Sequence, residues 1–173
     1  HFTTLSPVLG VVRLDEERSF VLADIPGLIE GAHEGVGLGH DFLRHVERTK
    51  VLLHIVDVAG VDGRDPIEDF DKINTELAEY SERLARRKQL VVANKMDLPE
   101  GQENFERLKE YVEAKGYEIC KASAATGEGL RELMFKAYDL LQQYVPEEDE
   151  EDIARFDEID PDSYEIVAGE DTE

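Results

Sequence analysis

The sequence has one cysteine, no tryptophan and few basic residues. A single cysteine, Cys120, excludes an internal disulfide and a zinc site built from several thiolates of this chain. Sparse cysteine is typical of a protein in a reducing compartment, so we expect a cytoplasmic location. Because Cys120 lies in the apolar stretch 117–120, a buried structural thiol is favoured over a nucleophile.

Long hydrophobic runs are also missing. The longest run, 51–58, is interrupted by His54 and Asp57. It is far shorter than the roughly 20 apolar residues that a transmembrane helix needs, so no membrane insertion is expected. Lys and Arg number 19 against 41 Asp and Glu, which gives a net charge of -22. This excess argues against non-specific binding to a nucleic acid backbone, and we expect no DNA binding.

The negative charge is concentrated near the end of the sequence. Residues 146–173 contain 14 acidic residues and one basic residue. The acidic run 147–152 at its start cannot bury enough apolar surface to order itself. We therefore predict a folded domain over 1–145 and an acidic linker, or the start of a C-terminal region, over 146–173.

Short apolar segments alternate with segments of helical periodicity. Strands are predicted at 8–14, 19–24, 51–57, 89–94 and 117–121. Apolar residues at helical spacing predict helices within 67–84, 105–112 and 130–144. This alternation favours an α/β fold with a mainly parallel sheet and helices on both faces. In such folds ligands bind at the carboxyl ends of the strands.

The most specific motif, Asn94-Lys95-Met96-Asp97, follows the strand predicted at 89–94. The Asp97 carboxylate can accept hydrogen bonds from both N1–H and the exocyclic amine of guanine, which adenine cannot match. Asn94 would join neighbouring loops, and the Lys95 stem would cover one face of the base. The alternative is an ordinary loop in which Asp97 caps the next helix.

A second strand ends in Asp24-Ile25-Pro26-Gly27. A carboxylate here can hold a water molecule of Mg²⁺ while the Gly27 amide approaches a terminal phosphate. The same tetrapeptide is also typical of an ordinary turn after a strand.

Two weaker segments complete the set. The amides of Ser123, Ala124 and Ala125 follow another predicted strand and can point at the guanine O6, although a plain turn has the same composition. Near the start, Thr3 and Thr4 offer hydroxyl groups to Mg²⁺ and amides to the γ-phosphate, or are merely residues that favour a strand.

In order and spacing, these four segments resemble the second to fifth signature motifs of Ras-like P-loop GTPases. The resemblance is closer to the Obg family, through the segments 2–10, 24–32 and 35–45: Phe2-Thr3-Thr4-Leu5-x-Pro7-x-Leu9-Gly10, Asp24-Ile25-Pro26-Gly27-Leu28-Ile29-Glu30-Gly31-Ala32 and Gly35-Val36-Gly37-Leu38-Gly39-His40-Asp41-Phe42-Leu43-Arg44-His45. It covers about residues 1–145 and implies a three-layer Ras-like P-loop GTPase domain with a mainly parallel sheet. Val8 departs from the family, which usually has Asn there.

The resemblance implies a role for each matched residue. Thr4 would ligate Mg²⁺, and Asp24 would contact the metal through water. The remaining residues would line the nucleotide: Phe2, Thr3, Leu5, Ser6, Ile25, Pro26, Gly27, Asn94, Lys95, Met96, Asp97, Ser123, Ala124 and Ala125. Leu28 stands where Ras-like enzymes place a catalytic glutamine, and a leucine cannot orient water, so the catalytic residue is left unassigned.

The function that the resemblance implies is a Mg²⁺-dependent GTPase switch that binds GTP and GDP and hydrolyses GTP slowly. Its implied partner is the large ribosomal subunit, and its implied roles are assembly of that subunit and stress control. Two alternatives remain open. One is a nucleotide-gated ribosome-binding module in which hydrolysis is incidental, and the other is a non-hydrolysing scaffold.

The sequence contains no Gly-x-x-x-x-Gly-Lys-Ser/Thr, the loop that cradles the α- and β-phosphates. Because Phe2-Thr3-Thr4 normally lies downstream of that loop, we expect His1 to be an internal residue of a longer protein. The domain is then incomplete at its N-terminal end, and this part alone would bind nucleotide weakly or not at all. A basic stretch, Arg86-Arg87-Lys88, is interpreted as a solvated helix end in preference to an RNA contact.

Overall fold

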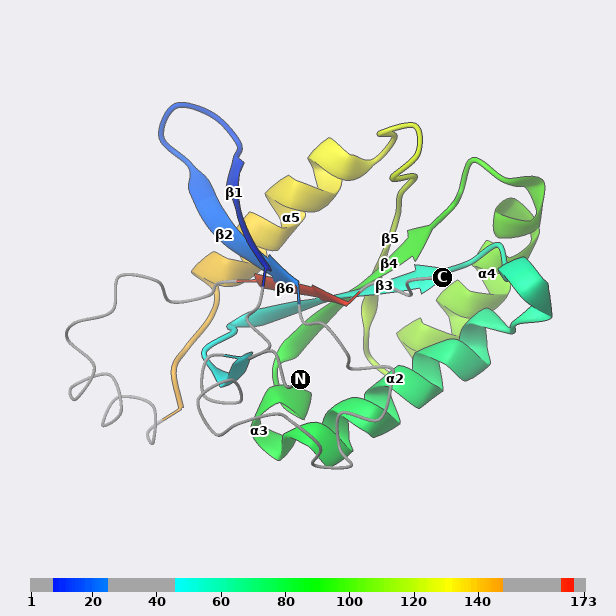
Figure 1. The fold of residues 1–173 in the computed structure, drawn as a ribbon, viewed down its shortest axis with the longest axis horizontal. Coiled ribbons are helices and arrows are strands. Elements are labelled where there is room, and N and C mark those ends of the chain that lie inside the picture. The colour runs from blue at the N-terminus through cyan, green and yellow to red at the C-terminus, as the bar shows by residue number, and fades with distance from the viewer. Residues whose placement is uncertain (1–7, 25–45, 148–165, 170–173) are drawn as a thin grey trace, which may run out of the picture.

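The structure is a computed structural model that describes residues 8–24 and 46–147 and the backbone of 166–169 (Figure 1). The strands are β1 (Val8–Arg13), β2 (Ser19–Asp24), β3 (Val51–Asp57), β4 (Lys88–Asn94), β5 (Glu118–Lys121) and β6 (Ile166–Gly169). The helices are α2 (Pro66–Tyr80), α3 (Glu82–Ala85), α4 (Pro99–Ala114) and α5 (Leu130–Gln142), with a short 3₁₀ turn, η2 (Val61–Gly63).

The strands form one sheet in the order β1-β2-β6-β3-β4-β5. The hairpin of β1 and β2 is antiparallel, and every other pairing is parallel. The mainly parallel sheet predicted from the sequence is therefore confirmed. β6 pairs with β2 on one side and β3 on the other, which places a segment far along the chain between two earlier strands.

Helices cover both faces of the sheet, as predicted, and Figure 1 shows α5 on one side and α2, α3 and α4 on the other. Side chains alternate along a strand, so neighbouring residues of β3 pack in different layers. Leu53 packs with Leu133 of α5. Leu52 packs with Leu77 and Leu84 on the opposite face. The half-buried Cys120 lies against the α5 layer, and burial raises the pKa of its thiol, as expected of a structural thiol.

The single helical segment predicted within 67–84 is interrupted. Ser81 has extended backbone angles (φ -157°, ψ 117°), and α3 begins after it. Its hydroxyl accepts a hydrogen bond from the Leu84 amide at 3.1 Å, which satisfies a free donor at the start of α3. The apolar periodicity continues across the break, and this is why the pattern alone predicts one helix.

The parallel arrangement determines where chemistry can occur. β3, β4 and β5 run in one direction, and Asp57 pairs with Asn94 at the ends of β3 and β4. Ala93 pairs with Lys121 on the next strand. The loops after these three strands therefore meet at one edge of the sheet. No helix over 8–24, 46–147 and 166–169 combines the length and apolarity needed to cross a membrane.

Candidate functional site

The loops after β4 and β5 are joined by backbone hydrogen bonds. The Ala122 amide donates to the Ala93 carbonyl at 2.8 Å, and the Met96 amide donates to the Ala122 carbonyl at 3.2 Å. The two segments predicted to bind guanine, 94–97 and 123–125, are thus brought together although they are separated by all of α4. Their roles remain a prediction, but their proximity is a property of the fold.

Asn94 joins three loops. Its Oδ1 accepts a hydrogen bond from the Ala124 amide at 3.0 Å. Its own carbonyl accepts from the Val58 amide at 3.2 Å, so the loop after β3 is also attached. The loop-joining contact predicted for Asn94 is present, and the residue works through both its side chain and its backbone.

The Asp97 carboxylate is oriented by Ser123. The Ser123 hydroxyl donates to Asp97 Oδ1 at 2.7 Å, while its oxygen accepts from the Thr126 amide at 3.2 Å. Ser123 is buried and Asp97 is exposed, so the serine fixes one carboxylate oxygen and solvent reaches the other. Sequence reasoning assigned Ser123 only a backbone role and missed this contact.

The interpretation of Asp97 as a helix cap is wrong. The N-cap of α4 is Leu98, and no side-chain hydrogen bond caps this helix. Pro99 occupies the first turn, where its missing amide leaves nothing unsatisfied. Asp97 therefore does not cap α4, and its second carboxylate oxygen, Oδ2, is available to a ligand.

Lys95 has a left-handed backbone (φ 66°), and its ammonium group pairs with Asp57. Nζ lies 2.9 Å from Asp57 Oδ2, and the other carboxylate oxygen accepts from the Ala59 amide at 3.0 Å. Asp57 was not predicted as a site residue, although a polar residue ending the apolar run 51–57 was a usable signal. The pair holds the lysine stem beside the Asn94–Asp97 loop.

Gly129 closes the second loop. It has φ +77°, and a Cβ at this position would overlap the Lys121 carbonyl oxygen. The loop is also held by a hydrogen bond of 2.9 Å from the Ser123 amide to the Glu128 carbonyl. A glycine is therefore required here for both backbone conformation and space.

A groove of about 740 Å³ adjoins these loops. Its lining includes Met96, Asp97, Phe105, Lys121, Ser123 and Gly129. The Lys121 ammonium lies 4.4 Å from the centre of the Phe105 ring and forms one wall. This volume is in the range of small-molecule sites.

Asp24 ends β2 on the same edge of the sheet, with β6 and β3 between it and β4. Partial burial raises the pKa of this carboxyl group. Within the part of the chain that the structure describes, no hydrogen bond or ion pair to its carboxylate is present. A partly desolvated carboxylate with no cationic partner among the described residues fits a hydrated divalent cation such as Mg²⁺.

The other residues predicted at the phosphate end lie outside the described residues: Phe2, Thr3, Thr4, Leu5, Ser6, Ile25, Pro26, Gly27 and Leu28. Over 8–24 and 46–147, no cluster of three or more His, Cys, Asp or Glu side chains could hold a metal by itself.

Residues 1–95 match the model of a family described as 50S ribosome-binding GTPase. A protein named GTPase Obg from Symbiobacterium thermophilum is 63% identical over 147 residues, which cover 85% of this chain and 35% of the relative. GTPase Obg from Fusobacterium nucleatum is 55% identical over 175 residues, covering 98% of this chain and 41% of the relative.

GTPase Obg from Caldicellulosiruptor bescii is 61% identical over 154 residues, covering 89% of this chain and 36% of the relative. The chain thus spans between 35% and 41% of the length of these curated relatives.

Proposed function

Because the chain belongs to the Obg family of P-loop GTPases, we propose that the full-length protein binds GTP and GDP and hydrolyses GTP slowly to GDP and phosphate. The observation that carries this proposal is the junction of the 94–97 and 123–125 loops, with an Asp97 carboxylate fixed on one side and accessible on the other.

The junction supports guanine as the base. A carboxylate offers two acceptor oxygens to N1–H and the exocyclic amine of guanine, whereas adenine presents an acceptor at N1. The Ser123 hydroxyl fixes the plane of the Asp97 carboxylate before the base arrives. A site with such an oriented partner can discriminate by as much as about 10⁴-fold, because the wrong base leaves its polar groups unpaired.

For the phosphate end, we propose that Thr4 holds Mg²⁺ directly and that Asp24 holds it through water. When bound, the ion would offset the negative charge of the β- and γ-phosphates. The Gly27 amide would donate to the γ-phosphate, with Ile25 and Pro26 beside it, while Phe2, Thr3, Leu5 and Ser6 line the nucleotide. The Leu28 side chain has no polar atom with which to orient water, so intrinsic turnover is slow, and hydrolysis relies on positioning by the phosphate cradle and metal, on another residue or on a group supplied by a partner.

We further propose that the protein acts as a cytoplasmic regulatory switch on the large ribosomal subunit, in its assembly and in stress control. The description of the matching family, 50S ribosome-binding GTPase, supports this partner. Slow turnover suits a timer whose GTP- and GDP-bound shapes differ in affinity for the partner.

Titration of the full-length protein with GTP, GDP and ATP tests the proposal. We expect guanine nucleotides to bind at least about 10³-fold more tightly than ATP. Equal affinities would overturn it. Asp24→Ala then separates a catalytic switch from a binding module: if ribosome association and its cellular consequence survive the loss of turnover, hydrolysis is incidental.

A further inference from the structure

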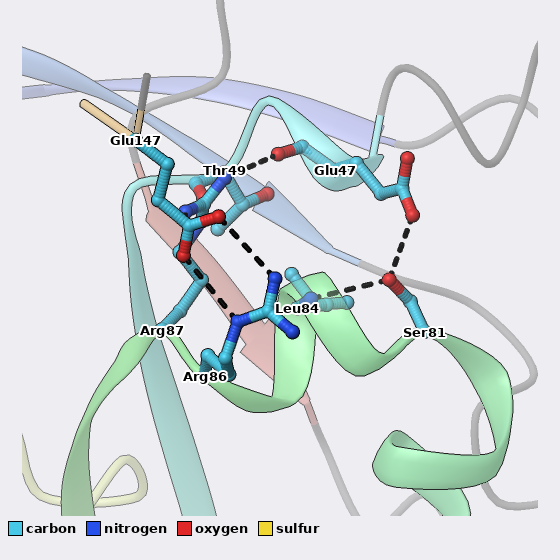
Figure 2. Close-up of polar contacts among 7 residues, drawn as sticks. All are labelled: Glu47, Thr49, Ser81, Leu84, Arg86, Arg87 and Glu147. Atoms are coloured by element: carbon cyan, nitrogen blue, oxygen red, sulfur yellow. Dashed lines mark hydrogen bonds and ion pairs between the residues drawn. The ribbon is translucent and has the colours of Figure 1, made fainter. Parts of the chain in front are cut away.

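Contacts with neighbouring segments hold both ends of β4. Just before β4 begins, the Arg87 side chain is 3% exposed and donates to the Thr49 and Glu47 carbonyls, at 2.8 and 3.1 Å (Figure 2). The interpretation of the basic stretch as a solvated helix end is therefore wrong for this residue. β4 separates Arg87 from Asn94 by about 20 Å at the usual rise of an extended strand, so this group of contacts is remote from the base site.

The contacts at the other end of β4 involve the 94–97 loop, which leads directly into α4. The amide of Leu98, the N-cap of α4, donates to the Lys95 carbonyl at 3.1 Å. One turn later, Gln102 Nε2 donates to the Met96 carbonyl at 3.3 Å. The start of α4 therefore holds two consecutive carbonyl groups in the middle of this loop.

Gly101 allows α4 to lie close to the 94–97 loop. It is buried in the first turn of the helix, where a Cβ would lie only 2.5 Å from the Lys95 carbonyl oxygen and 3.3 Å from Val58 Cγ1. Its backbone is helical, a conformation that alanine adopts more readily than glycine. Glycine is therefore required at this position by the close approach of the Lys95 carbonyl and not by backbone conformation.

The carbonyl that Gly101 faces belongs to a residue in a strained conformation. Lys95 has φ 66°, in the left-handed region that a residue with a Cβ rarely adopts. Such a conformation persists only where the surrounding structure imposes it. The Leu98 amide and the Gly101 backbone constrain the Lys95 carbonyl, while Asp57 holds the lysine side chain. A displacement of α4 would therefore act first on the middle of the 94–97 loop.

Asn104 provides a second connection from α4 to the same loop. Its half-buried side chain donates from Nδ2 to the Val58 carbonyl at 3.0 Å. The Val58 amide donates in turn to the Asn94 carbonyl at 3.2 Å. Because Val58 is 0% exposed, loss of the Asn104 amide would leave a buried carbonyl without this donor. The helix thus reaches the loop directly at Lys95 and, through Val58, at Asn94.

We propose that Gly101 and Asn104 are positioning residues for guanine recognition. The inference rests on the proposed function, in which Asp97 accepts hydrogen bonds from N1–H and from the exocyclic amine of the base. Ser123 fixes the Asp97 carboxylate, and α4 fixes the backbone that precedes it. Both attachments matter, because two hydrogen bonds to one base require the carboxylate to match that base in position and in plane.

Gly101→Ala in the full-length protein tests this role, with GDP and inosine diphosphate as ligands. Hypoxanthine lacks the exocyclic amine of guanine, so the ratio of the two affinities measures the second hydrogen bond to Asp97. We expect the wild type to prefer GDP at least about tenfold, and Gly101→Ala to prefer it less than about threefold. A substitution that affected only folding would lower both affinities equally and leave the ratio unchanged.

Glu103→Ala is the matched control, because it places an alanine at an exposed position in the same part of α4. Its two affinities and their ratio should stay within about twofold of wild type. Asn104→Ala is a second variant that keeps the inference testable if Gly101→Ala does not fold. It removes the donor to Val58 and leaves the Gly101 contact in place, so a smaller fall in the ratio, about two- to threefold, is expected.

A folded Gly101→Ala or Asn104→Ala that keeps the wild-type preference for GDP would overturn the inference. Equal affinities of the wild type for GDP and inosine diphosphate would overturn it as well. A wild-type protein that binds ATP as tightly as GDP would instead contradict the proposed function, and the inference would fall with it.

Discussion

The Ser123 hydroxyl and the Asp97 carboxylate meet across the loops that follow β5 and β4, with Oγ 2.7 Å from Oδ1. The serine is 1% exposed, so its position is set by the core, and the aspartate takes its orientation from it. A base that binds Asp97 meets a carboxylate already held in one plane. Preorganisation of this kind increases affinity because less freedom is lost on binding.

Ser123→Ala should weaken GDP binding about five- to thirtyfold. A hydrogen bond to a charged group is worth about 1–2 kcal/mol when one partner is exposed, and its loss leaves the carboxylate free to rotate. Titration with a fluorescent GDP analogue measures the change. Thr126→Ala is the matched control, since it removes a hydroxyl from the same loop that contacts Glu128 and not Asp97. Equal effects of the two variants would rule out the orienting role.

Lys95 and Asp57 should act as one unit. Asp57→Asn and Lys95→Met each remove the ion pair that holds the side chain of residue 95 in place, so each is expected to lower GDP affinity about threefold, in line with a partly exposed pair. The double variant should lose no more than either single variant, because the second change removes nothing further. Additive losses in a double-mutant cycle would show that the two residues act independently.

Gly129→Ala should destabilise the protein by about 2–4 kcal/mol, because the alanine suffers both a left-handed backbone and overlap with the Lys121 carbonyl. Gly116 offers a control with φ +89° and open space where a Cβ would lie. Gly116→Ala should lose only about 1–2 kcal/mol, from backbone conformation alone. Chemical unfolding of the two full-length variants provides the comparison, and equal losses would contradict the close packing at Gly129.

His54 should make stability fall as the pH is lowered from 7 to 5. Burial lowers the pKa of this imidazole from 6.5 to about 4, despite a contact of 3.2 Å with Gln89. Between these values the unfolded chain binds a proton that the folded protein does not, so stability rises with pH in this window. The free energy of unfolding should fall by about 2 kcal/mol between pH 7 and pH 5 because of this group.

His54→Phe is the comparison for that effect, since a phenyl ring can keep the stacking on Phe70, whose centre lies 5.0 Å from that of the imidazole. Urea unfolding at the two pH values should show a smaller loss for this variant. Carboxyl groups titrate in both proteins and cancel in the difference. The same pH dependence in both proteins would show that His54 is not the group responsible.

The parts of the fold that depend on local sequence patterns could be predicted from the sequence. The apolar run at 51–57 ends where β3 ends, and the run at 89–94 lies within β4. Strand direction follows from the alternation with helices, so the meeting of Asn94 with the loop after β5 could also be predicted. These inferences need only periodicity and the rule that parallel strands share a carboxyl edge.

Contacts between distant residues could not be predicted in the same way. In the sequence, Arg87 looks like part of a basic surface stretch. In the structure it donates to the carbonyl of Thr49, which lies 38 residues earlier in the chain. The partner of Lys95 is likewise 38 residues away. Neither composition nor helical spacing specifies which buried carbonyl or carboxylate a cation will reach, because that depends on how the layers pack.

Asp97→Asn in the full-length protein tests most directly whether Asp97 selects guanine. An amide in place of the carboxylate can donate to the carbonyl that xanthine carries where guanine has its amine. We predict that GDP affinity falls at least about 100-fold while affinity for xanthosine diphosphate rises, with Asp139→Asn, an exposed carboxylate on α5, changing neither. Unchanged GDP affinity in Asp97→Asn would show that this carboxylate does not select the base.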